Sequence, residues 1–503
     1  MAYVVTRSSV LAIMKETTEG TPVAPAAGTD FVALQDNFTL TPSFNSLENA
    51  ELRSSIGATK PIQGSEAPTA SLSHYVRASG VEGQAPNYGK LLEAAFGAVS
   101  IAAAEYDTVA SSTVAQIKVN TGEGATFERG EALLIKDGTN GYRIRCIDSV
   151  SGDNLNIGFE LPVAPAAGVN LGKAVLYKPV NTGHPSLTLW HFLGNGGAIQ
   201  MIAGARVTSY SVDIQAQELI NATYSIDGVS YSWNPVSILV TDQKLDFTDD
   251  GGAHAATVAI GYYKDPYDLA AAIQSAMNLV SNLGYVVTYS DTTGRFKIAG
   301  TGTLLSLLFL TGPNTANTIA DRIGFTTTDH TGATPTAGYT SDSPMSWTAP
   351  YTPSFDNSDP LVAKDNEIMV GGPDDYACFN ASSVTFTLED TKSDILSVCA
   401  VSGKRGSVVT ARAVTISVSA LLQQNAVENF KNFRSNDEVK FQYSYGVKTG
   451  GNWVPGKCGA LYVPTAVITS YSISDADGSA QLDLELAAFV NSTGDGEAYQ
   501  NFL

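Results

Sequence analysis

The sequence predicts a mainly β protein in which one β-rich unit occurs twice and two further domains are inserted. Three observations predict this fold class. The same four elements follow one another in both halves of the chain. The first copy is longer by one segment with a strand-and-turn pattern of its own. Between the two copies the pattern changes to mixed helix and strand.

The recurring elements keep one order. In the first half they are Phe38-Thr39-Leu40, an alternating strand at 69–76, a short amphipathic helix at 87–96 and Val-Thr-Ser-Tyr-Ser-Val at 207–212. In the second half they are Phe386-Thr387-Leu388, a strand at 412–422, a helix near 425–433 and Ile-Thr-Ser-Tyr-Ser-Ile at 468–473. The Phe-Thr-Leu pair is offset by 348 residues and the Thr-Ser-Tyr-Ser pair by 261, so the first copy is longer by 87. Duplicated scaffolds usually serve symmetry and assembly rather than chemistry.

In chain order we expect five parts. The first, at 1–34, contains Thr21-Pro22 and Pro25-Ala26-Ala27-Gly28, which favour an extended arm over a packed element. The predicted parts are the arm at 1–34, a first unit at 35–100 and 184–234, an inserted small β-barrel at 101–183, an inserted α+β domain at 235–345 and a second unit at 346–503.

The first insert, 101–183, explains nearly all of the difference in length. Two hairpin turn sequences, Asp137-Gly138-Thr139-Asn140-Gly141 and Ser151-Gly152-Asp153-Asn154, separate its short strands. These strands are predicted at 115–119, 132–136, 142–147 and 155–157. A small closed barrel is the natural interpretation. Because it gathers no cluster of aromatic or charged residues, we expect a structural role and no ligand.

The second insert, 235–345, has an α+β pattern. Asp265 and Pro266 are N-cap and first-turn signals for a helix that continues to Asn282 on an apolar stripe. Strands follow at 285–289 and 295–299, joined by a turn at 291–294. A second helix is expected at 316–323, ending at Gly324. The apolar stripe is ordinary core packing and requires no cofactor.

Each copy carries a long polar stretch without clear periodicity, at 41–68 and at 389–410. Such a loop inside a compact domain is usually functional or ordered by a partner. Both loops contain cations, Arg53 and Lys60 in the first and Lys404 and Arg405 in the second, although the chain has a net charge of −20. These four residues are therefore candidates for contacts between subunits. The alternative is a disordered surface loop.

The composition restricts the partners. With 503 residues the chain should hold three or four domains. Charged residues make up 16% of the chain, against about 25% in typical domains, so either partners cover much of the surface or the protein is simply rich in Ser, Thr and Gly. The net charge of −20 argues against gripping nucleic acid, which requires Lys and Arg. It is compatible with letting DNA pass without adhesion, or it serves solubility alone.

The cysteines and the apolar segments indicate a protein made in cytoplasm. Cys146, Cys378, Cys399 and Cys458 show neither a Cys-x-x-Cys pair nor a disulfide framework, so we expect buried thiols. The first twenty residues lack the apolar core of a signal peptide. The longest apolar run, 304–310, is too short to cross a bilayer, so no membrane partner is expected.

No motif indicates an enzyme, a cofactor or a metal. The segment 451–458 has phosphate-loop spacing, but Cys458 replaces the hydroxyl that would bind magnesium, and a strand follows where a helix is needed. A β-hairpin loop explains it better. The five histidines are scattered without metal-ligand spacing. Asp475-Ala476-Asp477-Gly478 lacks the later ligands of a calcium loop and is predicted to be a hairpin turn.

The arm and both copies resemble the major tail tube proteins of long-tailed, siphovirus-like bacteriophages. Ile13-Met14-Lys15-Glu16-Thr17-Thr18-Glu19-Gly20-Thr21-Pro22 is similar to their opening arm. The order of strand, long loop, strand, helix and strand in each copy is similar to the tail tube fold, a β-sandwich with a flanking helix. The two inserts resemble modules found in phage tail proteins. The chain departs from the simplest members in its duplication and its inserts.

The resemblance implies two tandem tail-tube-type β-sandwich or barrel units in a structural virion protein without catalytic, cofactor or metal sites. Subunits would close into stacked rings whose inner strands form a barrel. Since simple members form sixfold rings, a duplicated chain would form homotrimeric, pseudo-sixfold rings, with a hexamer as the alternative. Arg53, Lys60, Lys404 and Arg405 would then be inter-ring contacts.

The implied partners are further copies of the chain, the viral DNA and tape-measure protein that pass through the lumen without tight binding, and the tail terminator and distal tail proteins at the ends. The protein would be assembled in host cytoplasm and reside in the virion tail. Inserts on the outer surface would favour a non-contractile tail. The main competitor is an adhesin or baseplate component that binds host-surface glycans; an enzyme ranks third.

Overall fold

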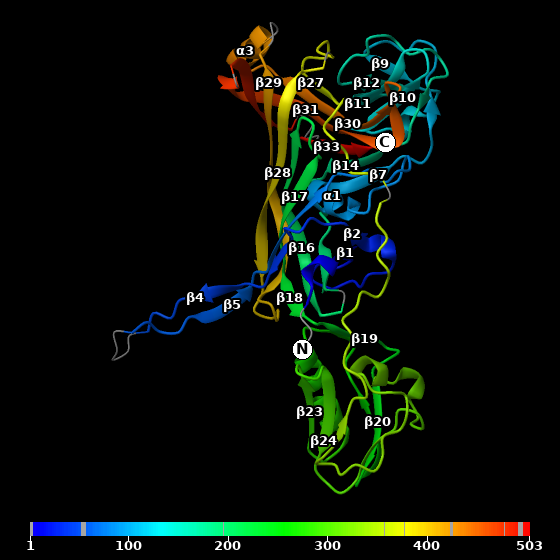
Figure 1. Ribbon diagram of the computed structural model, residues 1–503, viewed down its shortest axis with the longest axis vertical. Coiled ribbons are helices and arrows are strands. Elements are labelled where there is room, and N and C mark those ends of the chain that lie inside the picture. The colour runs from blue at the N-terminus through cyan, green and yellow to red at the C-terminus, as the bar shows by residue number, and fades with distance from the viewer. Residues whose placement is uncertain are drawn as a thin grey trace. The chain divides into compact units, whose positions relative to one another are not determined.

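The computed structural model describes residues 4–51, 57–194, 196–356, 358–376, 378–422, 426–476, 478–490 and 496–503 (Figure 1). The protein is mainly β, as the sequence predicts. It divides into two compact units, which are described separately. The small unit comprises Met1–Leu11, Leu189–Ile202 and Tyr231–Pro350, and the large unit comprises Ala12–Thr188, Ala203–Ser230 and Tyr351–Leu503.

An antiparallel sheet of eight strands, here called the main sheet, organises the large unit. Neighbours in it are hydrogen-bonded, and several of its long strands run side by side in Figure 1. In spatial order the strands are β3 (Thr39–Thr41), β6 (Thr69–Tyr75), β17 (Asn221–Asp227), β16 (Ala198–Gln215), β28 (Ala381–Leu396), β29 (Lys404–Leu421), β32 (Ser479–Ala488) and β31 (Asn452–Ala476). Apolar and polar residues alternate along them because one face covers the core.

The strand β31 joins the main sheet to a second group of strands. Its second half pairs with β32, whereas its first half pairs with β30 (Val439–Thr449) and β33 (Tyr499–Phe502). Beyond these lie β27 (Glu367–Gly371) next to β30, and β14 (Val175–Pro179) between β33 and β7 (Gly97–Ile101). Two short helices accompany the strands. Helix α1 (Gly89–Phe96) contacts β7 and β14, and α3 (Ala426–Ser435) contacts β31.

Residues 106–171 form a six-stranded sheet in the order β8 (Tyr106–Asp107), β13 (Asn170–Leu171), β10 (Ala132–Asp137), β11 (Gly141–Ser151), β12 (Asn154–Ile157) and β9 (Gln116–Lys118). The backbone N–H of Val109 donates to the carbonyl of Lys118 at 2.8 Å and so links the two ends of this order. The strands and both hairpin turns lie where the sequence predicts them. Inside is an apolar cluster that includes Ile117, Leu133 and Leu155.

The six-stranded sheet shares a buried core with the rest of the large unit. Leu134, Ile144 and Phe159 belong to one buried cluster with Trp453 and Tyr462 of β31. The predicted boundaries at 101 and 183 also enclose β14, which pairs with β7 and β33. The shared core therefore does not favour independent folding of this insert.

The small unit holds α2 (Pro266–Val280) and several short strands. Asp265 caps α2 by accepting a hydrogen bond from the N–H of Asp268 at 2.8 Å, as predicted. The strands are β19 (Val236–Ile238) with β22 (Gly261–Tyr263), β20 (Lys244–Asp249) with β21 (Gly252–Thr257) and β25 (Leu305–Leu307), and β24 (Arg295–Gly300) with β23 (Tyr285–Ser290) and β26 (Tyr339–Thr340).

One helix prediction in the small unit is wrong. The stretch 316–323 forms two 3-10 turns, Thr315–Asn317 and Ala320–Ile323. Thr318 between them has extended backbone, with φ −70° and ψ 142°, so an α-helix cannot continue. The predicted stop is present, because Gly324 has left-handed backbone with φ 76°.

The N-terminal arm is more packed than predicted. Residues 10–15 form β1 (Val10–Lys15), and β2 (Phe31–Val32) pairs with it. Ala12, Ile13 and Phe31 are at most 1% exposed. Glu16 fixes the arm to β15 (Leu187–Leu193) and β16, since its carboxylate accepts hydrogen bonds from Thr188 Oγ1 and the N–H of Gly204, both at 2.8 Å. The remaining short strand is β18 (Ser230–Trp233).

Both polar stretches predicted as loops contain β-hairpins. In the first, β4 (Phe44–Leu47) pairs with β5 (Ile62–Glu66). In the second, β28 and β29 stay paired from Ala381↔Ala420 to Leu396↔Lys404, which leaves only 397–403 as a tip. The sequence pattern hides these strands because both of their faces are largely exposed and no apolar alternation is needed.

The cysteine prediction holds for two of the four residues. Cys146 and Cys458 are buried, whereas Cys378 and Cys399 are exposed. The thiols of Cys378 and Cys399 lie in loops that the sequence pattern does not distinguish from core segments.

Candidate functional surface

The face of the main sheet that points away from the core is a continuous polar surface, here called the polar face. Its side chains alternate with buried ones along most of these strands, and the second half of β31 is the exception, because Ile473 on its other face is exposed. It consists of Thr39, Thr41, Thr69, Ser71, Ser73, Asn221, Thr223, Ser225, Asp227, Ser209, Ser211, Asp213, Ser383, Thr385, Thr387, Glu389, Thr415, Ser417, Ser419, Gln481, Asp483, Glu485, Ser470, Ser472 and Ser474. Hydroxyl groups dominate it.

The charged members named above are all acidic, namely Asp213, Asp227, Glu389, Asp483 and Glu485, and among the described residues of the face cations lie only at the end beside Asp227, whose register partner is Arg206. Hydrogen bonds from Ser419, Ser474 and Gln481 lower the pKa of Asp483, so this carboxylate is ionised at neutral pH. Thr385 donates to Asp213 at 3.1 Å. At one end of the face Asp227 is neutralised by Lys392, with 3.3 Å between Nζ and Oδ2.

The two halves of the main sheet share a local irregularity. In the β16–β17 pair the register shifts at Thr208, and in the β31–β32 pair it shifts at Thr469. Each threonine hydroxyl donates to a carbonyl of the neighbouring strand, that of Ser225 or that of Glu485, at 3.2 Å in both cases. A bulge is a specific feature of a strand pair, so its presence at the same position supports a common origin of the two halves.

The helices repeat a second common feature. The ring of Phe96 in α1 contacts that of Tyr210, with 5.8 Å between centroids. In α3 the ring of Phe433 contacts Tyr471, the counterpart of Tyr210, at 6.2 Å. In space, the strand order β3, β6, β17, β16 of the first half corresponds to β28, β29, β32, β31 of the second.

A buried arginine lies where the halves meet. Arg412 donates through Nε to Asp390 at 3.0 Å and through Nη2 to the carbonyl of Phe96 at 3.1 Å. The same Nη2 atom lies 2.6 Å from Nε2 of His184. Burial raises the pKa of Asp390 to about 6 although Arg412 opposes the shift. Because the group joins α1 of the first half to β28 and β29 of the second, it stabilises the junction.

The four residues predicted to contact other subunits differ in their surroundings. Arg53 lies outside the described residues. Lys60 and Arg405 are exposed. Lys404 is 5% exposed, and its Nζ lies 2.7 Å from Oδ2 of Asp394 in the same chain. Its charge is therefore already paired. The structure brings the two hairpins together, since the N–H of Glu66 donates to the carbonyl of Ser402 at 2.9 Å.

The hairpins also expose apolar side chains that the sequence argument missed. At the β28–β29 tip Val398 and Val401 are 105% and 94% exposed, and Leu396 is 68% exposed. On β4 and β5, Leu47 and Ile62 are each 55% exposed. Several exposed aliphatic side chains in one small region indicate an interaction surface. The sequence does contain these apolar residues, but they lie within stretches whose overall composition is polar.

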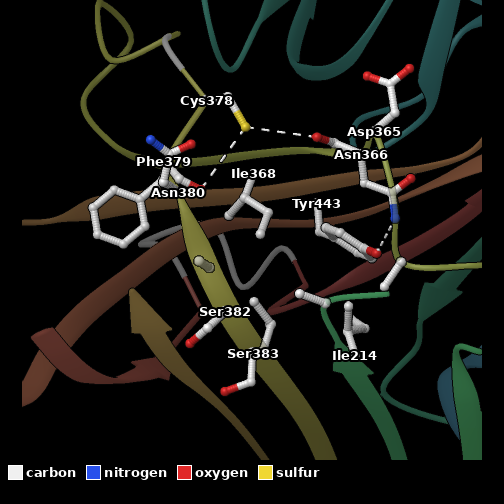
Figure 2. A pocket seen from close by; sticks show the side chains of 14 residues that line it. Ile214, Asp365, Asn366, Ile368, Cys378, Phe379, Asn380, Ser382, Ser383 and Tyr443 are labelled. Atoms are coloured by element: carbon white, nitrogen blue, oxygen red, sulfur yellow. Dashed lines mark hydrogen bonds between the residues drawn. The ribbon is translucent and has the colours of Figure 1, made fainter. Parts of the chain in front are cut away.

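A small pocket of about 160 Å³ lies beside the main sheet and is shown in Figure 2. Asn366 donates through Nδ2 to the hydroxyl of Tyr443 at 2.6 Å, and the thiol of Cys378 contacts the backbone carbonyl of Asn366 at 3.7 Å. The pocket offers no nucleophile paired with a base. Within the described residues, no group of His, Cys, Asp and Glu could hold a metal ion, and no helix has the length and hydrophobicity of a membrane span.

The main sheet thus combines a polar, largely acidic face with hairpins that expose apolar side chains. The sequence model of the phage tail tube protein family matches residues 6–260, which is just over half of the chain, and the chain belongs to this family. It is a structural protein of the virion tail, and the family implies self-assembly into a stacked tube.

The chain is also similar to chains of solved structures. A chain from the virion of a native gene transfer agent particle is 13% identical, with a TM-score of 0.20, and the match covers 25% of this chain and 92% of that one. A chain of the SPP1 tail tube is 13% identical, with a TM-score of 0.20 and coverages of 29% and 80%. No curated protein matches the sequence.

Proposed function

We propose that three copies of this chain close into a pseudo-sixfold ring and that such rings stack into the tail tube. The observation that carries this proposal is the strand order of the main sheet. Two four-stranded halves with the same bulge follow one another in one continuous sheet, so each chain supplies two of six similar positions. A hexamer, in which each chain supplies one position to the ring, is the alternative.

In this arrangement the polar face lines the lumen. Its hydroxyl groups and carboxylates would let viral DNA and the tape-measure protein pass without tight binding, because like charge disfavours adhesion to phosphate. A wall function also explains why the polar face has no catalytic constellation, and we propose no enzymatic activity. The opposite face of the main sheet covers the core and cannot serve as the wall.

The two hairpins contact the next ring. Lys60 and Arg405 are exposed cations that can meet acidic surface there, and Arg53 belongs to the same stretch as Lys60. The apolar tip residues Val398 and Val401 contribute the larger part of this contact, because burial of aliphatic side chains stabilises by about 1.5–3 kcal/mol each whereas exposed ion pairs contribute about 0.2–1 kcal/mol. Lys404 acts inside the chain by holding Asp394.

The remaining assignments concern the outside and the ends of the tube. The inserted α+β domain decorates the outer surface, which leaves no room for a contractile sheath and favours a non-contractile tail. Tail terminator and distal tail proteins bind the last rings, and assembly takes place in host cytoplasm. No observation favours an adhesin that binds glycans.

Negative-stain microscopy of the purified protein tests the proposal. Hollow tubes with a constant inner diameter are expected, either at once or after the protein is concentrated. Monodisperse globules under all conditions that keep the protein folded would contradict it.

A further inference from the structure

The large unit contains a junction between its two halves within a single chain. Here β16 pairs antiparallel with β28, and on the core side the ring of Tyr210 contacts that of Phe386, with 6.1 Å between centroids. This side is closed, since Tyr210, Val212 and Phe386 are 2%, 6% and 0% exposed. The register pairs Tyr210 with Leu388, Ser211 with Thr387 and Val212 with Phe386.

The same two edges recur at the ends of the main sheet, where no described strand lies beside them. Phe38-Thr39-Leu40 in and before β3 corresponds to Phe386-Thr387-Leu388, and Tyr471-Ser472-Ile473 in β31 corresponds to Tyr210-Ser211-Val212. The apolar side is open at the β31 end, whereas Leu40 of β3 is only 8% exposed. Ile473 is 57% exposed where Val212 is 6% exposed, and Phe430 of α3, which contacts the ring of Tyr471 at 5.4 Å, is 45% exposed.

We propose that the second half of β31 pairs with β3 of a second copy of this chain in the register of the internal junction. Tyr471 then lies opposite Leu40, Ser472 opposite Thr39 and Ile473 opposite Phe38 of that copy. The proposal rests on the proposed ring and names its lateral contact. The occupant follows from the sequence match of both edges to strands that already pair in the chain.

The pairing closes the surface that the free chain leaves open. Ile473 and Phe430 become covered as Val212 is covered in the internal junction. On the other face, Ser472 and Thr39 extend the polar face across the contact without adding a positive charge. The same order of four strands is thus repeated around the whole lumen of the ring.

Disulfide trapping tests the register. The exposed thiols are first removed as Cys378→Ser and Cys399→Ser, while Cys146 and Cys458 are buried and stay. Thr39→Cys with Ser472→Cys is the test pair. Thr39→Cys with Ser474→Cys is the matched control, because a two-residue shift adds about 7 Å along the strand and exceeds disulfide reach. Ser211→Cys with Thr387→Cys, the equivalent pair inside one chain, shows that this strand geometry can be bridged.

After mild oxidation of assembled tubes, the test pair should give at least about tenfold more linked chains than the control pair, with the ladder on a non-reducing gel ending at the covalent ring. Tubes that form without this link, while the internal pair closes, would overturn the register and leave the tube function intact. A parent with Cys378→Ser and Cys399→Ser that stays monomeric at all concentrations would contradict both the tube and this contact.

Discussion

At the residue scale, Arg412 and Asp390 show how a charge can be kept inside the protein. The pair is almost completely buried, with side chains 8% and 1% exposed, and the guanidinium also binds the carbonyl of Phe96. The raised pKa of Asp390 has a defined consequence for stability. The native state binds this proton more tightly than the unfolded chain does. The stability that protonated Asp390 contributes is therefore full at low pH and is lost as the pH rises through about 6.

Arg412→Ala should lower the free energy of unfolding by about 3–5 kcal/mol at pH 7.5, because Asp390 is left buried and charged. At pH 4.5 the loss should be smaller, since Asp390 is then protonated. Chemical denaturation at both pH values measures the difference. Arg405→Ala, which removes an exposed guanidinium from the same strand, should change stability by less than about 0.5 kcal/mol. Equal losses from Arg412→Ala at both pH values would show that Asp390 is not the cause.

The polar face gives a second prediction at this scale. Glu389 and Glu485 are exposed, so Glu389→Lys with Glu485→Lys should leave tubes assembled but make them retain short duplex DNA, with an affinity that falls steeply with salt. Fluorescence anisotropy of labelled DNA on purified tubes measures retention. The control, Glu389→Gln with Glu485→Gln, removes the charge without reversing it and should bind far less. Strong retention by the unaltered tubes would contradict a lumen that repels phosphate.

At the element scale, the hairpins combine exposed aliphatic residues with a few cations. Val398→Asp with Val401→Asp should shorten or abolish tubes while the subunit stays folded, because charged groups replace apolar ones in the contact between rings. Lys60→Glu with Arg405→Glu should have a milder, salt-dependent effect. Tube length by microscopy is the measurement. Val163→Asp, at an exposed valine of the six-stranded region, is the matched control and should leave length unchanged.

The two inserts should respond differently to deletion. Removing 235–345 with a short Gly/Ser bridge should preserve tubes of the same inner diameter, since this stretch has its own core around Ile273, Phe247 and Phe296. Removing 101–183 should abolish folding, because it strips β14 from the sheet and uncovers Trp453 and Tyr462. Soluble expression and microscopy compare them. Normal tubes from the second deletion would show that the shared cluster is dispensable.

Much of the fold at this scale follows from the sequence. Local turn and capping chemistry determines some elements, so the sequence predicts them. These are the hairpin turns at 137–141 and 151–154 and the cap at Asp265. The sequence does not predict the hairpins in 41–68 and 389–410, since strands exposed on both faces need no apolar alternation. Burial of Lys404 was equally hidden, because it depends on Asp394 across a hairpin whose register only the fold defines. The polar face could be predicted as alternating strands but not as one surface.

At the scale of the whole molecule, the proposed duplication would turn a contact between subunits into a junction inside one chain. Since β16 and β28 belong to one chain, half of the lateral contacts of the proposed ring would not depend on concentration. The other half would use β31 and β3 of different copies. This division predicts a ring with half as many chains as positions.

The number of chains per ring tests this account most directly. Mass measurement of isolated rings, or averaging of tube cross-sections in the electron microscope, should give three chains arranged around a lumen with six similar wall segments. Six chains per ring, with only one half of each chain lining the lumen, would contradict the account.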